Sequence, residues 1–334
     1  MPVLDPNDPE SLNRAARALA AGELVALPTE TVYGLAARAD DDAAVQGIYA
    51  AKGRPLDHPL IVHVADAHAA EAFVRQRPGL PARARTLIAR FWPGPLTVVV
   101  PRRPGVAQAA AAGAPTVALR CPDHPVAQAL LRQAAALGVP GVAAPSANRF
   151  GRVSPTEAAH VVAEFGPQLI VLDGGVCREG IESVIVDCSR TATYLLRPGT
   201  VARSAIQAAL GEPLLEPDAA APRTPGALAS HYAPAAPVHL GTLAELAGGV
   251  RAALAADPAA RIGVYSRHPV AGLAAAPGVL QWPMPDNATR AAHELFATLR
   301  RFDAQAVSSI WVEQPPGDSR WDGVRDRLQR ASTR

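Results

Sequence analysis

A single lysine stands out among the basic residues of this chain. Lys52 and 31 arginines make up the total of 32. A compact ammonium and a planar guanidinium are not interchangeable, so the retained lysine indicates a position that needs a point charge. Arg54 follows two residues later, and Gly53 and Pro55 predict that a helix ends there. Two cations this close suit an anion between them, and a polyphosphate would use both charges.

Small hydroxyl and amide side chains follow two of the predicted strands. Thr31 comes after a short apolar strand at residues 24–27, and Ser146 and Asn148 follow a strand at 142–144. Loops at strand ends are where open α/β sheets bind ligands. Each loop is also readable as an ordinary polar or capped turn, so on its own neither establishes an oxyanion or phosphate contact.

Two charged or titratable residues lie inside apolar strands. Arg120 ends the predicted strand 116–120, where it could clamp a carboxylate or belong to a structural ion pair. His63 follows three apolar residues in the predicted strand 60–64, where it is either a satisfied core histidine or a ligand contact. The residues alone leave both alternatives open.

Strands and helices alternate around these positions. Helices are expected at residues 41–52, 66–75 and 156–165, and residues 28–35 are expected to form a turn. Residues 1–205 therefore predict a mixed α/β domain. Residues 206–237 are rich in Pro and Ala and predict a semi-stiff linker, which contains His231 and Tyr232. Residues 238–334 predict a second, smaller α/β domain with a parallel sheet.

Composition excludes several classes of protein. The 334 residues are 49% hydrophobic and 19% charged, which excludes general disorder, and the net charge of +2 gives no strong field for nucleic acid. No apolar run approaches the ~20 residues of a membrane span, and no secretory signal is present, so a cytoplasmic location is expected. The three cysteines form no Cys-x-x-Cys pair and are expected to be buried. Gly-x-Gly, P-loop, Gly-x-Ser-x-Gly and His-Glu-x-x-His motifs are all missing.

Seven motifs together resemble the threonylcarbamoyl-adenylate synthase family, whose catalytic domain is of the YrdC type. They are Pro-Thr-Glu-Thr-Val-Tyr-Gly-Leu at 28–35, Lys-Gly-Arg-Pro at 52–55, His-Pro-Leu-Ile-Val-His-Val at 58–64, Trp-Pro-Gly-Pro-Leu-Thr at 92–97, Pro-Ser-Ala-Asn at 145–148, Ile-Glu-Ser at 181–183 and Leu-Arg-Pro-Gly at 196–199. The family's Lys-x-Arg and Ser-x-Asn signature is Lys52, Arg54, Ser146 and Asn148 here. The resemblance implies a YrdC-type twisted mixed sheet over residues 1–205, a linker over 206–237 that acts as an active-site lid, and a Rossmann-like domain over 238–334.

The resemblance also implies a reaction. L-Threonine, bicarbonate and ATP give L-threonylcarbamoyl-AMP and pyrophosphate, and a separate transferase carries the product to N6 of the adenosine at position 37 of certain tRNAs. Mg²⁺ arrives with ATP, and no protein side chain is implied as a metal ligand. Because the carbamate nucleophile is already an anion, the chemistry needs positioning and charge stabilisation more than a catalytic triad.

Site residues follow from the same resemblance, one position at a time. Catalytic roles fall on Lys52 and Arg54. The ATP side comprises Lys52, Arg54, His58, Thr116, Ser146, Asn148, Ser154, Arg197 and the linker residue Tyr232. The L-threonine side comprises Thr31, His63, Arg120, Ala144 and Ser183. This chain departs from the usual pattern at His58, where Asn is common, and at Ala144, where some members have Ser and only the backbone can contribute here.

Two other functions fit a domain of this type. The first is an RNA-binding module without adenylation activity. Weak binding of tRNA or other RNA is a further possible interaction of the chain. The second is a carbamoyl transferase of the hydrogenase-maturation type, but those chains add zinc fingers and this one has no Cys-x-x-Cys. Threonine-dependent turnover of ATP would separate the synthase from both.

Overall fold

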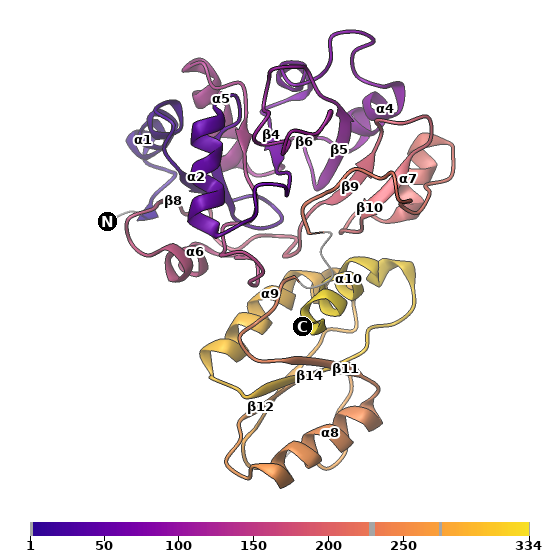
Figure 1. Ribbon diagram of the computed structural model, residues 1–334. Coiled ribbons are helices and arrows are strands. Elements are labelled where there is room, and N and C mark those ends of the chain that lie inside the picture. The colour runs from indigo at the N-terminus through magenta and orange to yellow at the C-terminus, as the bar shows by residue number, and fades with distance from the viewer. Residues whose placement is uncertain (1–2, 227–230, 274–275, 334) are drawn as a thin grey trace. The chain divides into compact units, whose positions relative to one another are not determined.

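The computed structural model describes residues 3–226, 231–273 and 276–333. The chain divides into two compact units, Met1–Phe150 with Ser154–Ala227 and Gly151–Val153 with Leu228–Arg334 (Figure 1). The first unit has a large mixed sheet and the second a small parallel one. The predicted fold class is therefore confirmed. No helix in the described ranges is long and apolar enough to cross a membrane.

The large sheet of the first unit runs in the order β1-β8-β2-β3-β7-β4-β6-β5-β9-β10. Its strands are β1 (Val3–Leu4), β2 (Val25–Leu27), β3 (Gly34–Arg38), β4 (Ile61–His63), β5 (Leu96–Pro101), β6 (Thr116–Arg120), β7 (Val142–Ala143), β8 (Ile170–Leu172), β9 (Val184–Asp187) and β10 (Tyr194–Arg197). The sheet contains both parallel and antiparallel pairs, and its strand order makes neighbours of segments distant in sequence.

The helices of the first unit are α1 (Pro9–Ala20), α2 (Asp42–Lys52), α3 (Ala67–Ala70), α4 (Ala82–Phe91), α5 (Pro125–Ala136), α6 (Ala158–Phe165) and α7 (Arg203–Leu210). Helix α2 begins where the Asp41 side chain accepts hydrogen bonds from the backbone N–H groups of Ala43 and Ala44. It ends at Gly53, whose φ of 63° is a left-handed conformation that glycine adopts without strain. These two signals place Lys52 in the last turn of α2.

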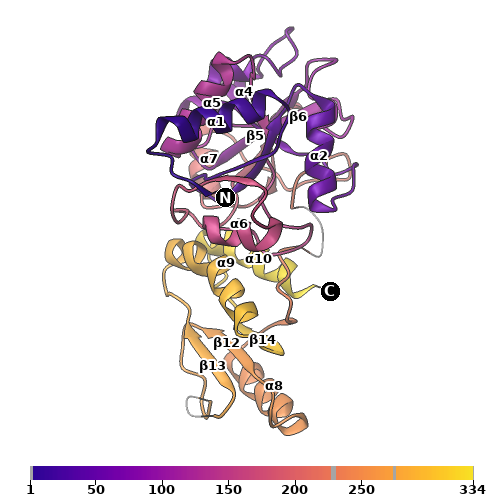
Figure 2. The same ribbon diagram turned by 90° about the vertical axis from the view of Figure 1, so that its left-hand side faces the viewer.

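One face of the large sheet is only partly covered by helices. Helices α1 and α5 pack on it over β2, β7 and β8, and Figure 2 shows these two helices side by side. The same face continues across β4, β6 and β5. Residues paired in register point to the same side, and the pairs are Val142 with His63, His63 with Arg120, and Arg120 with Thr97. A small apolar cluster lies on this continuation, formed by Ile61, Val99, Ala118, Ile185 and Leu196. We call the continuation, with this cluster and the three polar residues, the site face.

The segment after α7 packs along the first unit. Leu215 forms a β-bridge with Tyr194, and Ala221 packs against the apolar cluster of the site face. Arg223 forms an ion pair with Asp57, with 2.7 Å between Nη1 and Oδ2. Residues 211–226 therefore behave as part of the first unit.

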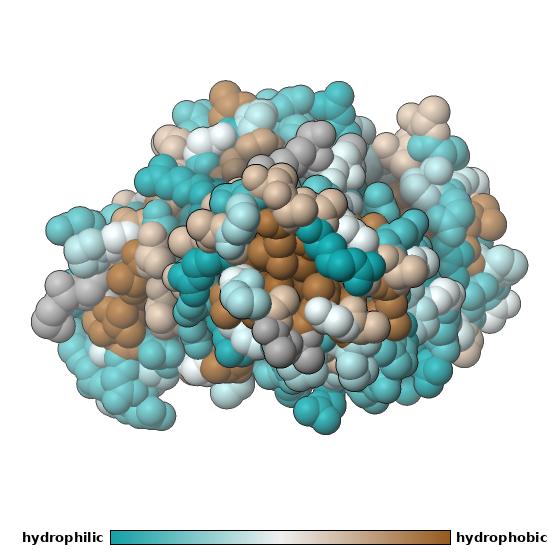
Figure 3. All heavy atoms as spheres, turned by 90° about the horizontal axis from the view of Figure 1, so that it is seen from below, coloured by the Kyte–Doolittle hydropathy of each residue, from teal (hydrophilic) through white to brown (hydrophobic). Residues whose placement is uncertain are grey.

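The second unit is a four-stranded parallel sheet in the order β11-β14-β12-β13. Its elements are β11 (Val238–Gly241), α8 (Leu243–Ala256), β12 (Ile262–Ser266), β13 (Val279–Pro283), α9 (Ala288–Ala304), β14 (Ser309–Glu313), a 3₁₀ turn (Ser319–Trp321) and α10 (Asp322–Ser332). A core cluster from α8 and β12 packs against the partly buried Leu254 and Trp311. Figure 3 shows hydrophobic side chains reaching the surface near the middle of the face it presents, with hydrophilic ones around them.

Three sequence predictions differ from the structure. The helix expected at 66–75 is the single turn α3, because residues 71–74 continue as turns and Val74 then bridges to Arg102. The turn expected at 28–35 gives way at Gly34 to β3, whose residues are buried on both faces and so lack the alternation typical of a strand. The linker expected at 206–237 begins inside α7, and its residues 227–230 lie outside the described ranges.

Candidate active site

Lys52 joins two of the predicted motifs. It is buried, and its ammonium Nζ lies 2.6 Å from the carbonyl oxygen of Ser146 and also donates to the carbonyl oxygen of Asn148. The Lys-Gly-Arg-Pro and Pro-Ser-Ala-Asn segments, 94 residues apart, are thus brought to one place. Burial, with the nearby Arg54 as a smaller cause, lowers the pKa of Lys52 well below its ordinary value.

Arg54 and His58 lie beside this lysine. Arg54 Nη2 donates to the carbonyl oxygen of Pro59 at 3.0 Å, and its guanidinium lies over the Phe150 ring at 5.8 Å. The His58 ring packs edge-on against the same Phe150, with 5.6 Å between centroids. Burial, followed by the charge of Arg54, lowers the pKa of His58. The backbone N–H of Phe150 donates to the Lys52 carbonyl, which ties the group together.

Three of the predicted threonine-side residues, His63, Arg120 and Ser183, lie together on the site face. His63 and Arg120 are register partners on β4 and β6. Ser183 precedes β9 and its hydroxyl lies 2.8 Å from that of Thr97, the β5 partner of Arg120. Arg197 donates to the Ser183 carbonyl oxygen through Nη2 at 2.8 Å and through Nε at 3.1 Å. The structure therefore brings Arg197, predicted on the ATP side, next to a threonine-side residue.

The local backbone allows this approach. Gly199, the last residue of the Leu-Arg-Pro-Gly motif, packs so tightly that a Cβ there would lie 2.4 Å from the Val184 nitrogen and 2.9 Å from the Ser183 carbonyl carbon. Only glycine permits this contact without movement of the strand. The motif thus brings Arg197 close to the start of β9.

His63 is buried and neutral at ordinary pH. Its Nδ1 lies 3.2 Å from the carbonyl oxygen of Ile61, which accepts the ring N–H and leaves Nε2 as an acceptor. Burial, with the adjacent Arg120 as the second cause, lowers the pKa of His63 to about 3. A ring with this pKa is a weak base, so the geometry favours a hydrogen-bond partner over a proton acceptor.

Arg120 has a carboxylate partner. Its Nη2 lies 2.7 Å from Oε1 of Glu30, and both side chains are almost completely buried. The ion-pair alternative for Arg120 is therefore present, although the pair does not exclude binding of a second carboxylate. Glu30 belongs to the Pro-Thr-Glu-Thr motif, next to the buried Thr31, whose hydroxyl lies 2.9 Å from that of Thr29.

The chain matches two family models and several characterised relatives. Residues 17–199 match the Sua5/YciO/YrdC family, described as telomere recombination, and residues 178–333 match the threonylcarbamoyl-AMP synthase C-terminal domain. The threonylcarbamoyl-AMP synthase of Bacillus subtilis is 38% identical, over 98% of this chain and 94% of that protein. The chain belongs to the threonylcarbamoyl-AMP synthase family. It is accordingly an enzyme of the adenylating, nucleotidyltransferase type.

Two solved structures of Pyrococcus abyssi Sua5 resemble the whole chain. A variant with a histidine and the adjacent tyrosine replaced by alanine has a TM-score of 0.87 and 32% identity, over 99% of this chain and 96% of that one. A complex with L-threonine has a TM-score of 0.83 and 34% identity, over 96% and 94%. The family fold therefore extends through both units.

Other positions predicted from the family lie apart from these groups. Thr116 begins β6 on the same face as Arg120, at the opposite end of the strand and about 13 Å away at the usual rise per residue. The backbone N–H of Ala144 donates to the Ile61 carbonyl, so only its carbonyl oxygen is left for a ligand. Tyr232 lies in the second unit, where it stacks on Phe296 and faces the buried Arg327.

Glu182 is a residue that sequence reasoning missed. It accepts a hydrogen bond from the Ser154 hydroxyl and is adjacent in sequence to Ser183. Its charge also acts on Lys52. It therefore links positions predicted on the ATP side with one on the threonine side. Thr97 and Glu30 were missed as well, although the quoted motifs contain all three.

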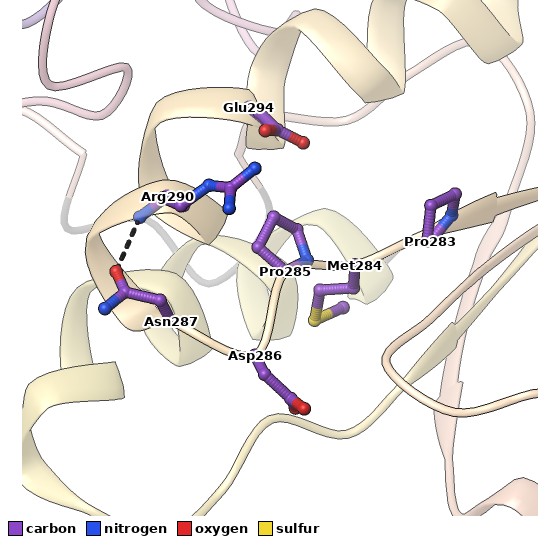
Figure 4. Close-up of a pocket in the computed structure, with 7 residues that line it drawn as sticks. All are labelled: Pro283, Met284, Pro285, Asp286, Asn287, Arg290 and Glu294. Carbon is purple, nitrogen blue, oxygen red and sulfur yellow. Dashed lines mark hydrogen bonds between the residues drawn. The ribbon is translucent and has the colours of Figure 1, made fainter.

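A pocket in the second unit contains none of the predicted residues. It lies where β13 leads into α9 and is lined by Pro283, Met284, Pro285, Asp286, Asn287, Arg290 and Glu294 (Figure 4). Asn287 caps the helix there by accepting from the Arg290 backbone N–H at 3.1 Å. Within the described ranges, no three His, Cys, Asp or Glu side chains are grouped as metal ligands.

Proposed function

We propose that this enzyme makes L-threonylcarbamoyl-AMP from L-threonine, bicarbonate and ATP, with release of pyrophosphate. The observation that carries the proposal is the contact of Lys52 with both carbonyl oxygens of the Ser146–Asn148 loop. This contact unites the two halves of the family signature beside Arg54. The Pyrococcus abyssi relative was crystallised with L-threonine, which supports threonine as the amino-acid substrate.

The proposed reaction has two balanced steps. In the first step bicarbonate takes up a proton and loses water to give CO₂, and the amine of L-threonine adds to this CO₂ and loses a proton, giving a carbamate. A carbamate oxygen then attacks the α-phosphorus of ATP, a P–O bond forms, and the bond to the β,γ-diphosphate breaks to release pyrophosphate. The nucleophile carries its own negative charge, so the protein contributes orientation and cations.

The chain's cations suit the two substrates differently. Lys52 and Arg54 lie together and are expected to hold the triphosphate, with Ser146, Asn148 and Ser154 as polar contacts. Arg120 is expected to take the carboxylate of threonine, with His63 and Ser183 beside it. The apolar cluster between Arg120 and Thr116 offers a surface for the adenosine part of ATP.

Mg²⁺ is expected to arrive bound to ATP. The candidate residues are cations, hydroxyls and amides, a donor set that fits phosphate oxygens better than a dedicated metal cage. Bound Mg²⁺ would neutralise developing charge on the leaving pyrophosphate. Lys52 and Arg54 would hold the phosphates to which it is bound.

The segment 211–226 is proposed as the lid. Pro225 accepts a hydrogen bond from Arg197 Nη1 at 3.0 Å, and Ala221 packs on the apolar cluster. A ligand on that cluster would have to displace or be covered by this segment. Tyr232 remains proposed as an ATP contact on the family resemblance alone.

The product is proposed to serve tRNA modification. Threonylcarbamoyl-AMP is a mixed anhydride, so its consumer is a transferase that moves the threonylcarbamoyl group to N6 of the adenosine at position 37 of tRNA. We propose that this takes place in the cytoplasm, where ATP and tRNA are present. Weak binding of tRNA by the synthase itself remains compatible with the proposal.

Pyrophosphate release by the purified full chain tests the proposal. Release should require both L-threonine and bicarbonate, and it should disappear in Lys52→Ala. Release that is indifferent to threonine, or no release together with RNA binding, would contradict it and favour the RNA-binding alternative.

A further inference from the structure

The Glu30–Arg120 pair is ionic without being fully hydrogen-bonded. The atoms Nη2 and Oε1 are 2.7 Å apart, yet neither makes a hydrogen bond of good geometry within the described ranges. Arg120 Nε is likewise buried and unpartnered there. A buried donor left unsatisfied costs about 1–3 kcal/mol, so such atoms call for an explanation.

Glu30 is fixed in place independently of Arg120. Its Oε2 accepts the backbone N–H of Asp123 at 3.0 Å, and its own carbonyl oxygen accepts the backbone N–H of Glu179 at 2.7 Å. The side chain is about 1% exposed. The backbone of Glu30 is thus held by one bond and its carboxylate by another, and the carboxylate cannot move away from Arg120 without loss of the bond to Asp123.

Arg120 lies between residues that the proposed function assigns to threonine. His63 and Thr97 flank it on β4 and β5, and Thr97 bonds to Ser183. Glu30 faces Nη2 of the Arg120 guanidinium, and because a guanidinium has five N–H donors, one carboxylate at Nη2 leaves donors for a second.

We propose that Glu30 is a positioning residue, which fixes the guanidinium of Arg120 so that its remaining N–H groups receive the carboxylate of the amino-acid substrate. The inference rests on the proposed function for the identity of that substrate. Glu30 does not touch the substrate itself. It acts by compensating a buried cation and by restricting the rotation of its side chain.

Direct binding measurements on the full-length chain test the role of Glu30. Isothermal titration calorimetry would compare L-threonine with L-threoninamide, which lacks the negative carboxylate. Glu30→Gln keeps the size of the side chain and one acceptor but removes the charge. We expect its Kd for L-threonine to rise about tenfold, while its Kd for L-threoninamide stays as in the natural sequence.

Asp187→Asn is the matched control. Asp187 is a fully buried carboxylate of the same unit that pairs with Arg190 at 2.9 Å. Its loss should reduce stability without a change in the preference for threonine over threoninamide. A general effect of losing a buried charge is thereby separated from positioning of Arg120.

The outcomes are distinct. The inference is overturned if Glu30→Gln binds L-threonine at least as tightly as the natural sequence. It is also overturned if the variant loses affinity for L-threonine and L-threoninamide equally. If Glu30→Gln does not fold, Glu30→Asp keeps the charge but ends one methylene short, and it should show the same selective loss. If the natural protein binds L-threonine but releases no pyrophosphate, the proposed function is refuted and the test of Glu30 still stands. If the natural protein does not bind L-threonine, both the proposed function and the role of Glu30 are overturned.

Discussion

Replacing Lys52 by methionine should reveal how much a buried ammonium is needed. Lys52→Met keeps the length and apolar stem of the side chain but removes the hydrogen bonds to Ser146 and Asn148. Each such bond contributes roughly 1 kcal/mol, so about 2 kcal/mol of stability should be lost from this source. Turnover should fall by about 10²–10³-fold, as when one charge-stabilising group is removed from an active site.

Lys52 also makes the free energy of unfolding of the natural protein depend on pH. Because the folded pKa of Lys52 lies well below its unfolded value of 10.5, the unfolded chain binds one more proton at every pH between the two values. Stability of the natural protein should therefore increase with pH in that window, by up to about 1.4 kcal/mol per pH unit from this group. Lys52→Met should lack this increment.

Urea unfolding at several pH values below 10.5, followed by circular dichroism, measures the difference between the two proteins. Cysteines and tyrosines titrate in both, so their contributions cancel when the curves are subtracted. Arg132→Met, at an exposed arginine on α5, is the control because it removes a cation of the same unit away from Lys52. Equal pH slopes for the natural protein and Lys52→Met would refute the depressed pKa, and near-normal turnover would refute the role in catalysis.

Three further outcomes follow from the described contacts. Ser183→Ala should raise KM for L-threonine more than KM for ATP, because it removes the hydroxyl bonded to Thr97. Steady-state kinetics with each substrate varied in turn would measure both constants, and equal changes in the two would contradict the prediction. His63→Gln should make the free energy of unfolding less dependent on pH in acid. The pKa of His63 is about 3 in the folded protein and 6.5 in the unfolded chain, so the unfolded chain binds an extra proton between these values and stability falls as the pH drops. Unfolding curves at pH 4–7 would measure the difference. The three thiols should resist alkylation at pH 8, because burial raises the pKa of Cys121 to about 11 and those of Cys177 and Cys188 to about 12. Rapid labelling of the folded protein, detected by mass spectrometry, would contradict their burial.

Much of the site could be predicted because its residues occur at ends of elements with strong local signals. Gly53 ends α2 and so locates Lys52, and Pro145 and the small residues after β7 locate the loop that Lys52 contacts. Arg120 ends an apolar strand that matches the structure at both ends. Local sequence is informative here because helix ends and buried strands depend on neighbouring residues.

The remaining features depend on contacts that local patterns do not encode. The partnership of Glu30 with Arg120 spans 90 positions and arises from the crossing order of the sheet. The strand β3 is buried on both faces, so its alternation is lost. Proline content indicated an extended segment after α7, but packing of Ala221 on the apolar cluster is a tertiary contact that composition cannot predict.

The partners of Lys52 and Arg120 differ in kind. Lys52 donates to the backbone carbonyl oxygens of Ser146 and Asn148, which orient its ammonium. Arg120 faces the carboxylate of Glu30, which offsets its positive charge and holds its side chain. The carboxylate of the proposed amino-acid substrate would therefore meet a well-oriented donor at Arg120 rather than a strong positive field.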